Sequence, residues 1–493
     1  MSQDMLKFVD RKGQMPDKRP AADRRHDWRE VYAPYEPNTA AEQAARCSQC
    51  GVPFCQIHCP VQNNIPDWLL LATQGRMEEA YEVSAGTNNF PEICGRICPQ
   101  DRLCEGNCVI EQSGHGTVTI GAVEKHITET AFAEGWVKPP RPTHERSESI
   151  GIVGAGPAGM AAAEQLRQLG YQVHVYDRYD RVGGLMVYGI PNFKLEKHVV
   201  QRRADLLVEG GIRFHLNFEV GRDASLPELQ ARHDAVLLAT GVYKARELAA
   251  PGVGLANIVQ ALPYLTASNR MGLGETLADY ASGQLNAAGT RVVVVGGGDT
   301  AMDCVRTAVR QGARSVTCLY RRDRENMPGS AREVRHAEEE GVEFAWLAQP
   351  EAFLGDSEIN AIRTRHMRLG AADASGRRIV MVDEDDAFSV DADLAIMALG
   401  FDPEDMNTTL GAPDLAVTRW GTVRTRYPTM STNLDGVFAA GDVVRGASLV
   451  VWAIREGRDA ADGIHQWLAS RAMTPAMAAE SMSDEIVMTG PHG

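Results

Sequence analysis

The sequence lacks long apolar segments, an excess of basic residues and a segment typical of an N-terminal signal. Apolar runs such as Val292–Val295 have the length of a strand and are far too short to cross a bilayer. Residues Met1–Arg25 are polar and charged, without the apolar core of a secretory signal peptide. The net charge of −15 argues against a nucleic-acid partner, which needs a basic footprint. These absences predict a soluble and most simply cytoplasmic protein.

Cysteine is concentrated at one end of the chain. Eight of the ten cysteines lie within the first 110 residues, and they form two quartets. In a reducing compartment such clusters favour metal binding over disulfides. The two quartets are Cys47, Cys50, Cys55 and Cys59, and Cys94, Cys98, Cys104 and Cys108. Cys59 and Cys98 are each followed by proline, which is typical of ferredoxin-like iron–sulfur ligation.

Zinc is the alternative metal for the quartets. Zinc sites usually pair two Cys-x2-Cys units, or combine one such unit with histidines. Only Cys47 and Cys50 have this spacing, and His58 alone is a poor complement. The nucleotide-binding motifs that follow favour iron–sulfur clusters over zinc.

The region around the cysteines is predicted to be helical. One helix is expected over Gly121–Glu134, where apolar residues recur at four-residue spacing. Glu124 lies beside this apolar stripe, and its default interpretation is a solvated helix carboxylate. The prolines of Pro139–Pro142 stiffen the chain and mark a domain boundary.

The first nucleotide fingerprint begins with an apolar strand, Ser149–Val153. The strand leads into the turn Gly154-Ala155-Gly156-Pro157-Ala158-Gly159, then a helix over Met160–Leu169 and a strand over Tyr171–Tyr176 that ends at Asp177. Glycines let the backbone approach a pyrophosphate, whose charge lies at the helix N-terminus, and the acid accepts hydrogen bonds from a ribose. This order of elements predicts a dinucleotide site.

Further motifs extend this site in the manner of flavoprotein reductases. Arg181-Val182-Gly183-Gly184 would continue along the pyrophosphate, and Ala239-Thr240-Gly241 closes a predicted strand, Ala235–Ala239. Arg178 and Leu185 adjoin these motifs and are also candidates for cofactor binding.

A third flavoprotein motif lies near the C-terminus. A strand ending in Ala440-Gly441-Asp442 is typical of the segment that completes an FAD site, where Asp442 would hydrogen-bond the ribityl chain. A helix from about Ser448 to Leu468 would direct its N-terminus at the flavin. A plain core strand is the alternative, but it leaves the order of the motifs unexplained.

A second nucleotide fingerprint lies between these flavin motifs. The predicted strand Arg291–Val295 leads into Gly296-Gly297-Gly298-Asp299-Thr300-Ala301, in which Ala301 replaces the third glycine, a permitted variant. The next strand, Ser315–Tyr320, ends in Arg321-Arg322 rather than in an acid. Arginines suit a 2′-phosphate, so NADPH is favoured over NADH. The alternative for either arginine alone is a solvated basic turn.

Together the motifs resemble the small (beta) subunits of bacterial NADPH-dependent glutamate synthases over nearly the whole chain. The resemblance rests on Cys47-x2-Cys50-x4-Cys55-x3-Cys59-Pro60, Cys94-Gly95-Arg96-Ile97-Cys98-Pro99, Cys104-x3-Cys108, Gly184–Pro191 and the ending at Asp442. The same module resembles the N-terminal half of dihydropyrimidine dehydrogenase and subunits of ferredoxin-coupled NADPH oxidoreductases. No pyrimidine-reducing or glutamine-hydrolysing domain is expected in this chain.

The resemblance implies FAD, NADPH and two 4Fe–4S clusters. Cys47, Cys50, Cys55 and Cys108 would hold one cluster, and Cys59, Cys98 and Cys104 would hold the other. The fourth ligand of the second cluster is either Glu124, which matches a glutamine ligand of dihydropyrimidine dehydrogenase, or Cys94. Cys304 and Cys318 are isolated and are expected to pack in the core.

The implied function is oxidation of NADPH and transfer of its electrons through FAD and the clusters to a large (alpha) subunit. That subunit would carry glutaminase and FMN/iron–sulfur synthase sites and make L-glutamate from glutamine and 2-oxoglutarate in a hetero-oligomer. FAD would convert a two-electron hydride into single electrons, which needs no catalytic acid, base or nucleophile. The inserted domain is expected to swing relative to the flavin domain.

Two other functions are consistent with these motifs. One is electron input for a different NADPH:ferredoxin-type oxidoreductase. The other is a non-enzymatic, zinc-stapled subunit that senses NADPH.

The expected fold class is α/β, with two Rossmann-like dinucleotide-binding domains preceded by an α-helical iron–sulfur domain. The FAD domain is split by the inserted NADPH domain. The expected limits are 1–145 for the helical domain, 146–245 and 406–475 for the FAD domain, 246–405 for the NADPH domain and 476–493 for a C-terminal tail.

Overall fold

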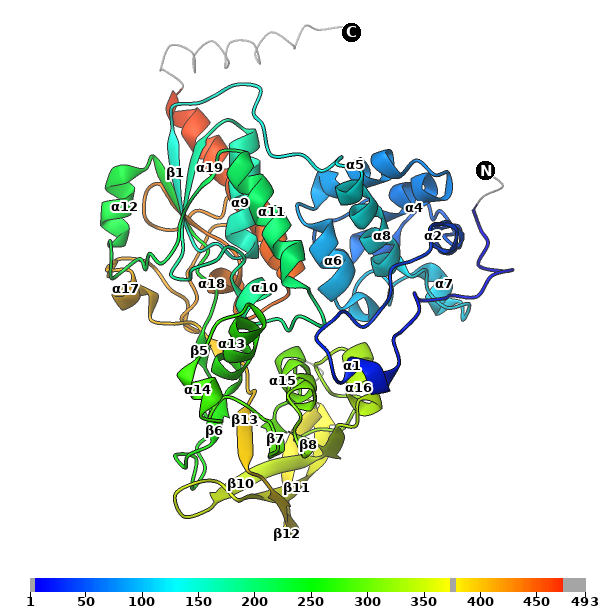
Figure 1. The fold of residues 1–493 in the computed structure, drawn as a ribbon. Coiled ribbons are helices and arrows are strands. Elements are labelled where there is room, and N and C mark those ends of the chain that lie inside the picture. The colour runs from blue at the N-terminus through cyan, green and yellow to red at the C-terminus, as the bar shows by residue number, and fades with distance from the viewer. Residues whose placement is uncertain (1–4, 373–377, 473–493) are drawn as a thin grey trace, which may run out of the picture.

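The computed structural model describes residues 5–372 and 378–472, so the expected tail lies outside the described residues. The chain begins as a group of short helices (Figure 1). Trp68, Leu69, Val123 and Ile127 are fully buried in their shared core. The helices are α1 (Ala21–Arg24), α2 (Pro37–Ala44), α3 (Phe54–Ile57), α4 (Ile65–Thr73), α5 (Met77–Thr87), α6 (Pro91–Ile97), the 3-10 turn η1 (Gln100–Arg102), α7 (Val109–Gln112) and α8 (Ile120–Ala133).

The first sheet has five parallel strands in the order β15-β4-β1-β2-β3. They are β1 (Ser149–Val153), β2 (Gln172–Tyr176), β3 (Arg213–His215), β4 (Ala235–Leu238) and, from the far end of the chain, β15 (Val437–Ala439). Since β15 pairs with β4 across about 200 residues of sequence, the chain leaves the first sheet after β4, forms an insertion and returns to the sheet before β15.

Helices cover both faces of this sheet. Ile150 and Ile152 face a core shared with α9 (Pro157–Gln168), α11 (Lys197–Glu209) and α19 (Val450–Ala472). Val236 and Leu238 face the opposite core, against α12 (Leu226–Arg232) and α17 (Met406–Thr409). The short helices α10 (Leu185–Tyr188) and α18 (Asp442–Arg445) lie at the carboxyl ends of the strands, where ligands bind in folds of this kind.

The insertion builds a second parallel sheet, in the order β6-β13-β7-β8-β9. Its strands are β6 (Ile258–Gln260), β7 (Arg291–Val295), β8 (Ser315–Tyr320), β9 (Glu343–Trp346) and β13 (Leu394–Met397). One face packs against α13 (Ala261–Gly272), α15 (Asp299–Arg310) and α16 (Ala331–Glu339), while α14 (Ala278–Ala281) follows α13. The other face packs against an antiparallel sheet of β10 (Ala348–Leu354), β11 (Ala361–Ala372) and β12 (Arg378–Asp391).

The two connections that join the insertion to the first sheet pair with each other. Strand β5 (Lys244–Ala245) lies antiparallel to β14 (Phe401–Asp402). An ion pair of 2.8 Å between Arg246 and Asp402 adds to this contact.

The N-terminal segment leaves the helical group and lies against α15 and α16 of the insertion (Figure 1). Arg24, Arg306 and Arg310 surround the carboxylate of Glu340, and the side chains of all four are fully buried. The Arg24 Nε–Glu340 Oε1 distance is 2.9 Å, across 316 residues of sequence. The insertion is therefore held by the start of the chain as well as by its own two connections.

The predicted element types are confirmed, with small shifts of their ends. The strands at Ser149–Val153, Arg291–Val295 and Ser315–Tyr320 have the predicted limits. Helix α9 begins at Pro157 rather than Met160, because proline suits the first helical position.

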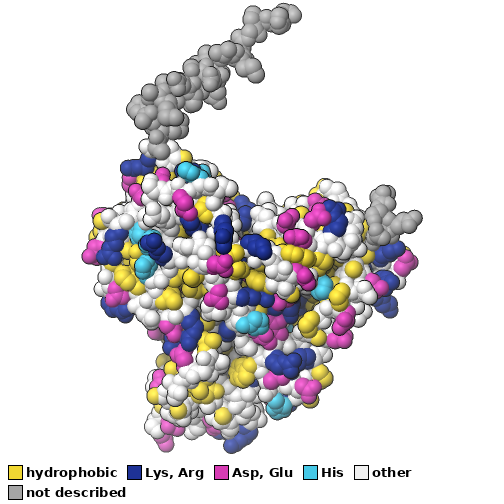
Figure 2. All heavy atoms as spheres, turned by 45° about the horizontal axis from the view of Figure 1, so that its top comes forward, with side chains coloured by type: hydrophobic (Ala, Val, Ile, Leu, Met, Phe, Trp, Pro, Cys, Tyr) yellow, Lys and Arg dark blue, Asp and Glu magenta, His cyan; other side chains and the backbone are white. Residues whose placement is uncertain are grey.

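The described residues contain no helix with both the length and the apolar character needed to span a bilayer. On the face shown in Figure 2, acidic and basic side chains are interspersed.

Candidate functional site

The first glycine turn joins β1 to α9, and its glycines differ in what surrounds them. A Cβ on Gly154 would lie 2.3 Å from the Ala239 oxygen, and one on Gly159 would lie 1.9 Å from the Gly154 oxygen. A Cβ on Gly156 would meet nothing within 4 Å. Gly154 and Gly159 therefore serve the fold, whereas Gly156 leaves space open at the N-terminus of α9.

Asp177, at the end of β2, holds the turn in place. Its Oδ2 accepts a hydrogen bond of 2.6 Å from the Ala155 backbone, and its Oδ1 accepts one of 2.8 Å from the Tyr179 backbone. Burial raises the pKa of Asp177. Arg178, the next residue, stacks on the Tyr243 ring at 4.2 Å and pairs with Glu404 at 3.4 Å.

The C-terminal motif returns to the same place. Gly441 has a φ of 80° and approaches Ala158 closely, since a Cβ there would lie 3.0 Å from the Ala158 Cβ. Its backbone N–H donates to Glu456 of α19 at 2.9 Å. Burial raises the pKa of the neighbouring Asp442 to about 6.

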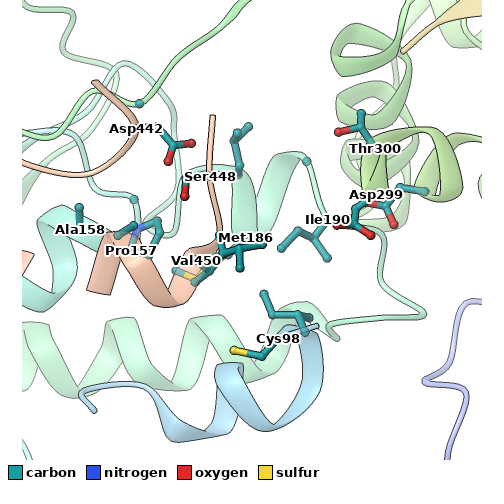
Figure 3. A pocket seen from close by; sticks show the side chains of 18 of the residues that line it. Cys98, Pro157, Ala158, Met186, Ile190, Asp299, Thr300, Asp442, Ser448 and Val450 are labelled. Atoms are coloured by element: carbon teal, nitrogen blue, oxygen red, sulfur yellow. The ribbon is translucent and has the colours of Figure 1, made fainter. Parts of the chain in front are cut away.

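A cavity lies where these segments meet (Figure 3). It brings together many of the predicted flavin-site residues: Gly154, Gly156, Pro157, Ala158, Asp177, Leu185, Thr240, Gly241 and Asp442. Asp299 and Thr300 of the second fingerprint line it from another side, and Cys94 and Cys98 line it from the helical region. Three parts of the chain thus share one cavity. Gly183 and Gly184 lie behind this lining, packed against Val187 and Gly156.

The second glycine turn has the same division of roles. A Cβ on Gly296 would lie 2.2 Å from the Ala398 oxygen, and one on Gly297 would lie 2.3 Å from the Tyr320 ring. A Cβ on Gly298 would meet nothing within 4 Å. Ala301, which replaces the third glycine, is fully buried in α15.

The two arginines after β8 have different environments. Arg321 is exposed. Arg322 is buried, and its Nε donates to the Arg378 oxygen at 3.4 Å.

The cysteines form two groups that cut across the quartets of the sequence. One group lies close enough together for its thiols to affect each other's pKa: Cys47, Cys50, Cys55 and Cys108. Burial raises the pKa of Cys47 to about 11 and that of Cys55 to about 12. We call these four the distal group.

The proximal group lines a second, smaller cavity. It comprises Cys59, Cys94, Cys98, Cys104 and Glu124. A hydrogen bond with Cys94 and then burial raise the pKa of Cys98, and burial raises that of Cys104. Cys55 lies close enough to Cys104 to affect its pKa, so the two groups are adjacent.

Glu124 corrects the default interpretation of the sequence. It is 8% exposed rather than solvated, and burial raises its pKa to about 8. Ser84 donates to Glu124 Oε1 at 3.4 Å, and Asn88 also forms a side-chain hydrogen bond with Glu124. The predicted apolar stripe of α8 is confirmed. The burial of Glu124 depends on cysteines elsewhere in the chain that line the same cavity, and the sequence of one helix does not reveal them.

Within the described ranges, no three or more His, Cys, Asp or Glu side chains converge on one metal-ion position. The two groups are therefore defined by mutual proximity, and the proximal one also by the cavity that it lines, not by a closed single-ion coordination sphere.

Sequence reasoning missed several charged residues at the cavity. Lys194 pairs with Asp303 of α15 at 2.9 Å, and Arg332 of α16 also lines the cavity. Lys194 lies three residues after the motif Gly184–Pro191, and this proximity could have marked it as a candidate site residue. Arg332 lies outside every motif and has no such signal.

The chain matches two families of known proteins. Residues 24–136 match dihydropyrimidine dehydrogenase domain II, which carries a 4Fe–4S cluster. Residues 148–457 match pyridine nucleotide-disulphide oxidoreductases. FprA of Mycobacterium tuberculosis in complex with NADPH has a similar fold, with a TM-score of 0.56 and 19% identity over 69% of this chain and 89% of that one. The chain is an NADPH-dependent flavin and iron–sulfur oxidoreductase.

Relatives define the family more closely. The glutamate synthase [NADPH] small chain of Azospirillum brasilense is 66% identical over 97% of this chain and 100% of its own length. The putative oxidoreductase AegA of Escherichia coli is 44% identical over 93% of this chain, which spans 70% of AegA. The chain belongs to the glutamate synthase [NADPH] small chain family, whose role is electron transfer from NADPH.

Proposed function

We propose that this chain delivers electrons from NADPH to the large subunit of a glutamate synthase, which uses them to make L-glutamate from glutamine and 2-oxoglutarate. The observation that carries the proposal is the shared cavity. Flavin-type motifs, the second fingerprint and Cys98 line one space, so the bound cofactors would lie next to one another. Bound FAD would supply the conversion of a hydride into single electrons, and the clusters would carry these onward.

The cavity lining supports an FAD site on the first sheet. Gly156 leaves room for a pyrophosphate at the N-terminus of α9, and this end of a twelve-residue helix favours negative charge. Asp442 lines the same cavity near Pro157 and Ala158, where it could contact the bound cofactor. Gly154, Gly159, Gly183, Gly184 and Gly441 shape the backbone around this space.

The second turn supports an NADPH site by the same argument. Gly298 leaves space at the N-terminus of α15, and Asp299 and Thr300 face the cavity. Arg321 is our candidate for the 2′-phosphate because it is exposed, whereas Arg322 is buried against a backbone carbonyl.

The two cysteine groups support two 4Fe–4S clusters. Thiolates buried as deeply as these are costly without positive charge nearby, and iron supplies that charge. We assign Cys47, Cys50, Cys55 and Cys108 to the distal cluster, and Cys59, Cys98 and Cys104 to the proximal one. For its fourth ligand we favour Glu124 over Cys94, since both line the cavity but the Cys94 thiol already donates to Asn88 Oδ1 at 3.8 Å.

The positions of the two groups suggest an order. Cys94 and Cys98 line both the large cavity and the proximal one, while the distal group adjoins Cys104 through Cys55. Electrons would therefore pass from the flavin side to the proximal group, then to the distal group and the partner. We propose the domain limits expected from the sequence: 1–145 for the helical domain, 146–245 with 406–475 for the FAD domain, and 246–405 for the NADPH domain.

The proposal can be tested by reconstitution. The chain is purified anaerobically, analysed for flavin and iron, and mixed with a glutamate synthase large chain. We expect one FAD and about eight irons per chain, bleaching by NADPH, and glutamate formation that requires both chains. Flavin and iron without any glutamate formation would contradict the choice of partner while leaving the oxidoreductase intact.

A different acceptor is the second candidate, because AegA contains a matching region within a longer chain. The deciding measurement is which acceptor oxidises the NADPH-reduced protein faster, the large chain or a ferredoxin. Faster oxidation by ferredoxin, with no large-chain complex, would favour this candidate.

A further inference from the structure

One arginine of the insertion reaches into the loop that carries two proximal cysteines. Arg332, in the first turn of α16, donates from Nη1 to Gln100 at 2.9 Å and from Nη2 to Glu105 at 2.8 Å. Gln100 is two residues after Cys98, and Glu105 directly follows Cys104. The guanidinium thus joins the two ends of the segment between these cysteines.

The same contacts continue to helix α8, which carries Glu124. Glu105 accepts a hydrogen bond of 3.1 Å from the Gly121 backbone, and Gln100 donates to the Cys94 oxygen at 3.1 Å. A Cβ on Gly121 would lie 2.3 Å from the Gln100 amide nitrogen, so the loop and α8 are tightly packed. Arg332 therefore contacts the loop between Cys98 and Cys104 directly, and through Gln100 and Glu105 it is linked to Cys94 and to α8.

The charges at this contact are poorly screened by water. The Glu105 side chain is 4% exposed and that of Arg332 is 22% exposed. Net charge close to an iron–sulfur cluster sets its reduction potential, and a nearby cation makes reduction easier. Removal of either partner would leave the other charge uncompensated beside Cys104.

We propose that Arg332 is a positioning residue that raises the reduction potential of the proximal cluster. It acts from the NADPH-binding part of the chain, since Arg332 also lines the cavity with Asp299 and Thr300. This inference rests on the proposed cluster assignment. It predicts that Arg332 and Glu105 shift the potential of one cluster in opposite directions.

The test is a redox titration of the intact holoprotein followed by electron paramagnetic resonance. Arg332→Gln is expected to lower the midpoint potential of one cluster, shifting its equilibrium with the flavin about tenfold towards the flavin, or 59 mV for one electron. Glu105→Gln is expected to raise the potential of the same cluster. Arg332→Lys keeps the charge and should stay within about twofold of the wild type.

Arg335→Gln is the matched control. It removes the same charge from the same helix, but its side chain is exposed. It should change neither cluster, because solvent screens an exposed charge.

Three outcomes would overturn the inference: no shift in Arg332→Gln, an equal shift of both clusters, or shifts of the same sign in Arg332→Gln and Glu105→Gln. If Arg332→Gln does not fold, Glu105→Gln still tests the sign of the shift, and Arg332→Lys tests that the charge is what matters. A wild type without iron–sulfur signals would instead contradict the proposed clusters themselves.

Discussion

At the scale of single residues, the glycines of each fingerprint divide into two kinds. Gly154 and Gly159 are required by the backbone, since a Cβ on either would lie within 2.3 Å of a carbonyl oxygen. Gly156 and Gly298 face open space. Their backbone angles do not require glycine either, because the φ of Gly156 is −77° and that of Gly298 is −90°. The proposed FAD and NADPH would account for glycine at these two positions, because their phosphates would approach the backbone there.

This distinction predicts different effects for substitutions of Gly156 and Gly159, one on flavin binding and the other on stability. Gly156→Ala should fold normally but lose flavin by about tenfold or more, since a methyl group against the pyrophosphate costs at least about 1.4 kcal/mol. Gly159→Ala should destabilise the apoprotein by about 1–3 kcal/mol through overpacking. Flavin absorbance per chain and urea unfolding would measure the two effects. A flavin-replete Gly156→Ala protein would remove this turn from the cofactor site.

The fourth ligand of the proximal cluster can be decided by iron content. Glu124→Ala should lose one cluster, or about four of eight irons per chain, whereas Cys94→Ala should keep both. Glu129→Ala is the control, since it lies on the same helix α8 but pairs with Arg202 and Arg96 and does not line the proximal cavity. The reverse result, with iron lost only in Cys94→Ala, would assign the ligand to Cys94.

At the scale of helices and strands, local signals predicted most of what positions the site. The runs Ser149–Val153 and Arg291–Val295 are apolar throughout because both faces of a central parallel strand are buried, and each is followed by a glycine turn. The antiparallel strands β10–β12 were not predicted. Strand β11 alternates between buried and exposed residues only in part, and half of the residues of β12 are polar or charged, without a strict alternation in the sequence.

Contacts between distant segments that carry no motif could not be predicted. Arg24 and Glu340 are 316 residues apart, and neither belongs to a motif. The Arg332–Glu105 contact is of the same kind, with 227 residues between the partners. Such pairs depend on how whole helices and strands pack against one another, and a single sequence contains no pattern that predicts this packing.

The attachment of the N-terminal segment to α16 predicts a contrast between two neighbouring glutamates. Glu340→Gln should destabilise the protein by about 3–5 kcal/mol, because three buried arginines lose their shared counter-charge. Glu339→Gln should cost no more than about 1 kcal/mol, since Glu339 is 37% exposed although it also pairs with Arg24. Urea unfolding of both variants would measure the difference.

The pH dependence of the Glu340 contact follows from its pKa. Hydrogen bonds and charges of the arginines outweigh burial and lower the pKa of Glu340 to about 2, from 4.5. A lowered pKa gives stability that is complete above about pH 4.5 and is lost only as the pH falls towards 2. The difference in unfolding free energy between wild type and Glu340→Gln should therefore be equal at pH 6 and pH 8. A clear change between these values would show that Glu340 is not held as a carboxylate by the arginines.

At the scale of the whole molecule, three parts of the chain surround one cavity and hold each other across it. Lys194 joins the first sheet to α15, Arg24 joins the N-terminal segment to α16, and Arg332 joins α16 to the cysteine loop. The sequence led us to expect a swing of the inserted domain. Any such motion must break these contacts, two of which involve buried charges, so an attached insertion is the state that the structure favours.

Electron input and electron output should be separable in this arrangement. Gly298→Ala places a methyl group at the N-terminus of α15, where nothing in the protein lies within 4 Å, so folding should be unaffected. We expect the KM for NADPH to rise about tenfold or more through loss of the close backbone approach to the pyrophosphate. Flavin and iron content should equal those of the wild type, and dithionite should reduce the clusters to the same extent.

Glu124→Ala should show the opposite pattern, with flavin still reduced by NADPH at a normal KM but with less iron to accept the electrons. If Gly298→Ala lost iron, or Glu124→Ala raised the KM for NADPH, the two ends of the path would be coupled through the cavity, and the contacts of Arg332 would be the first place to look for the connection.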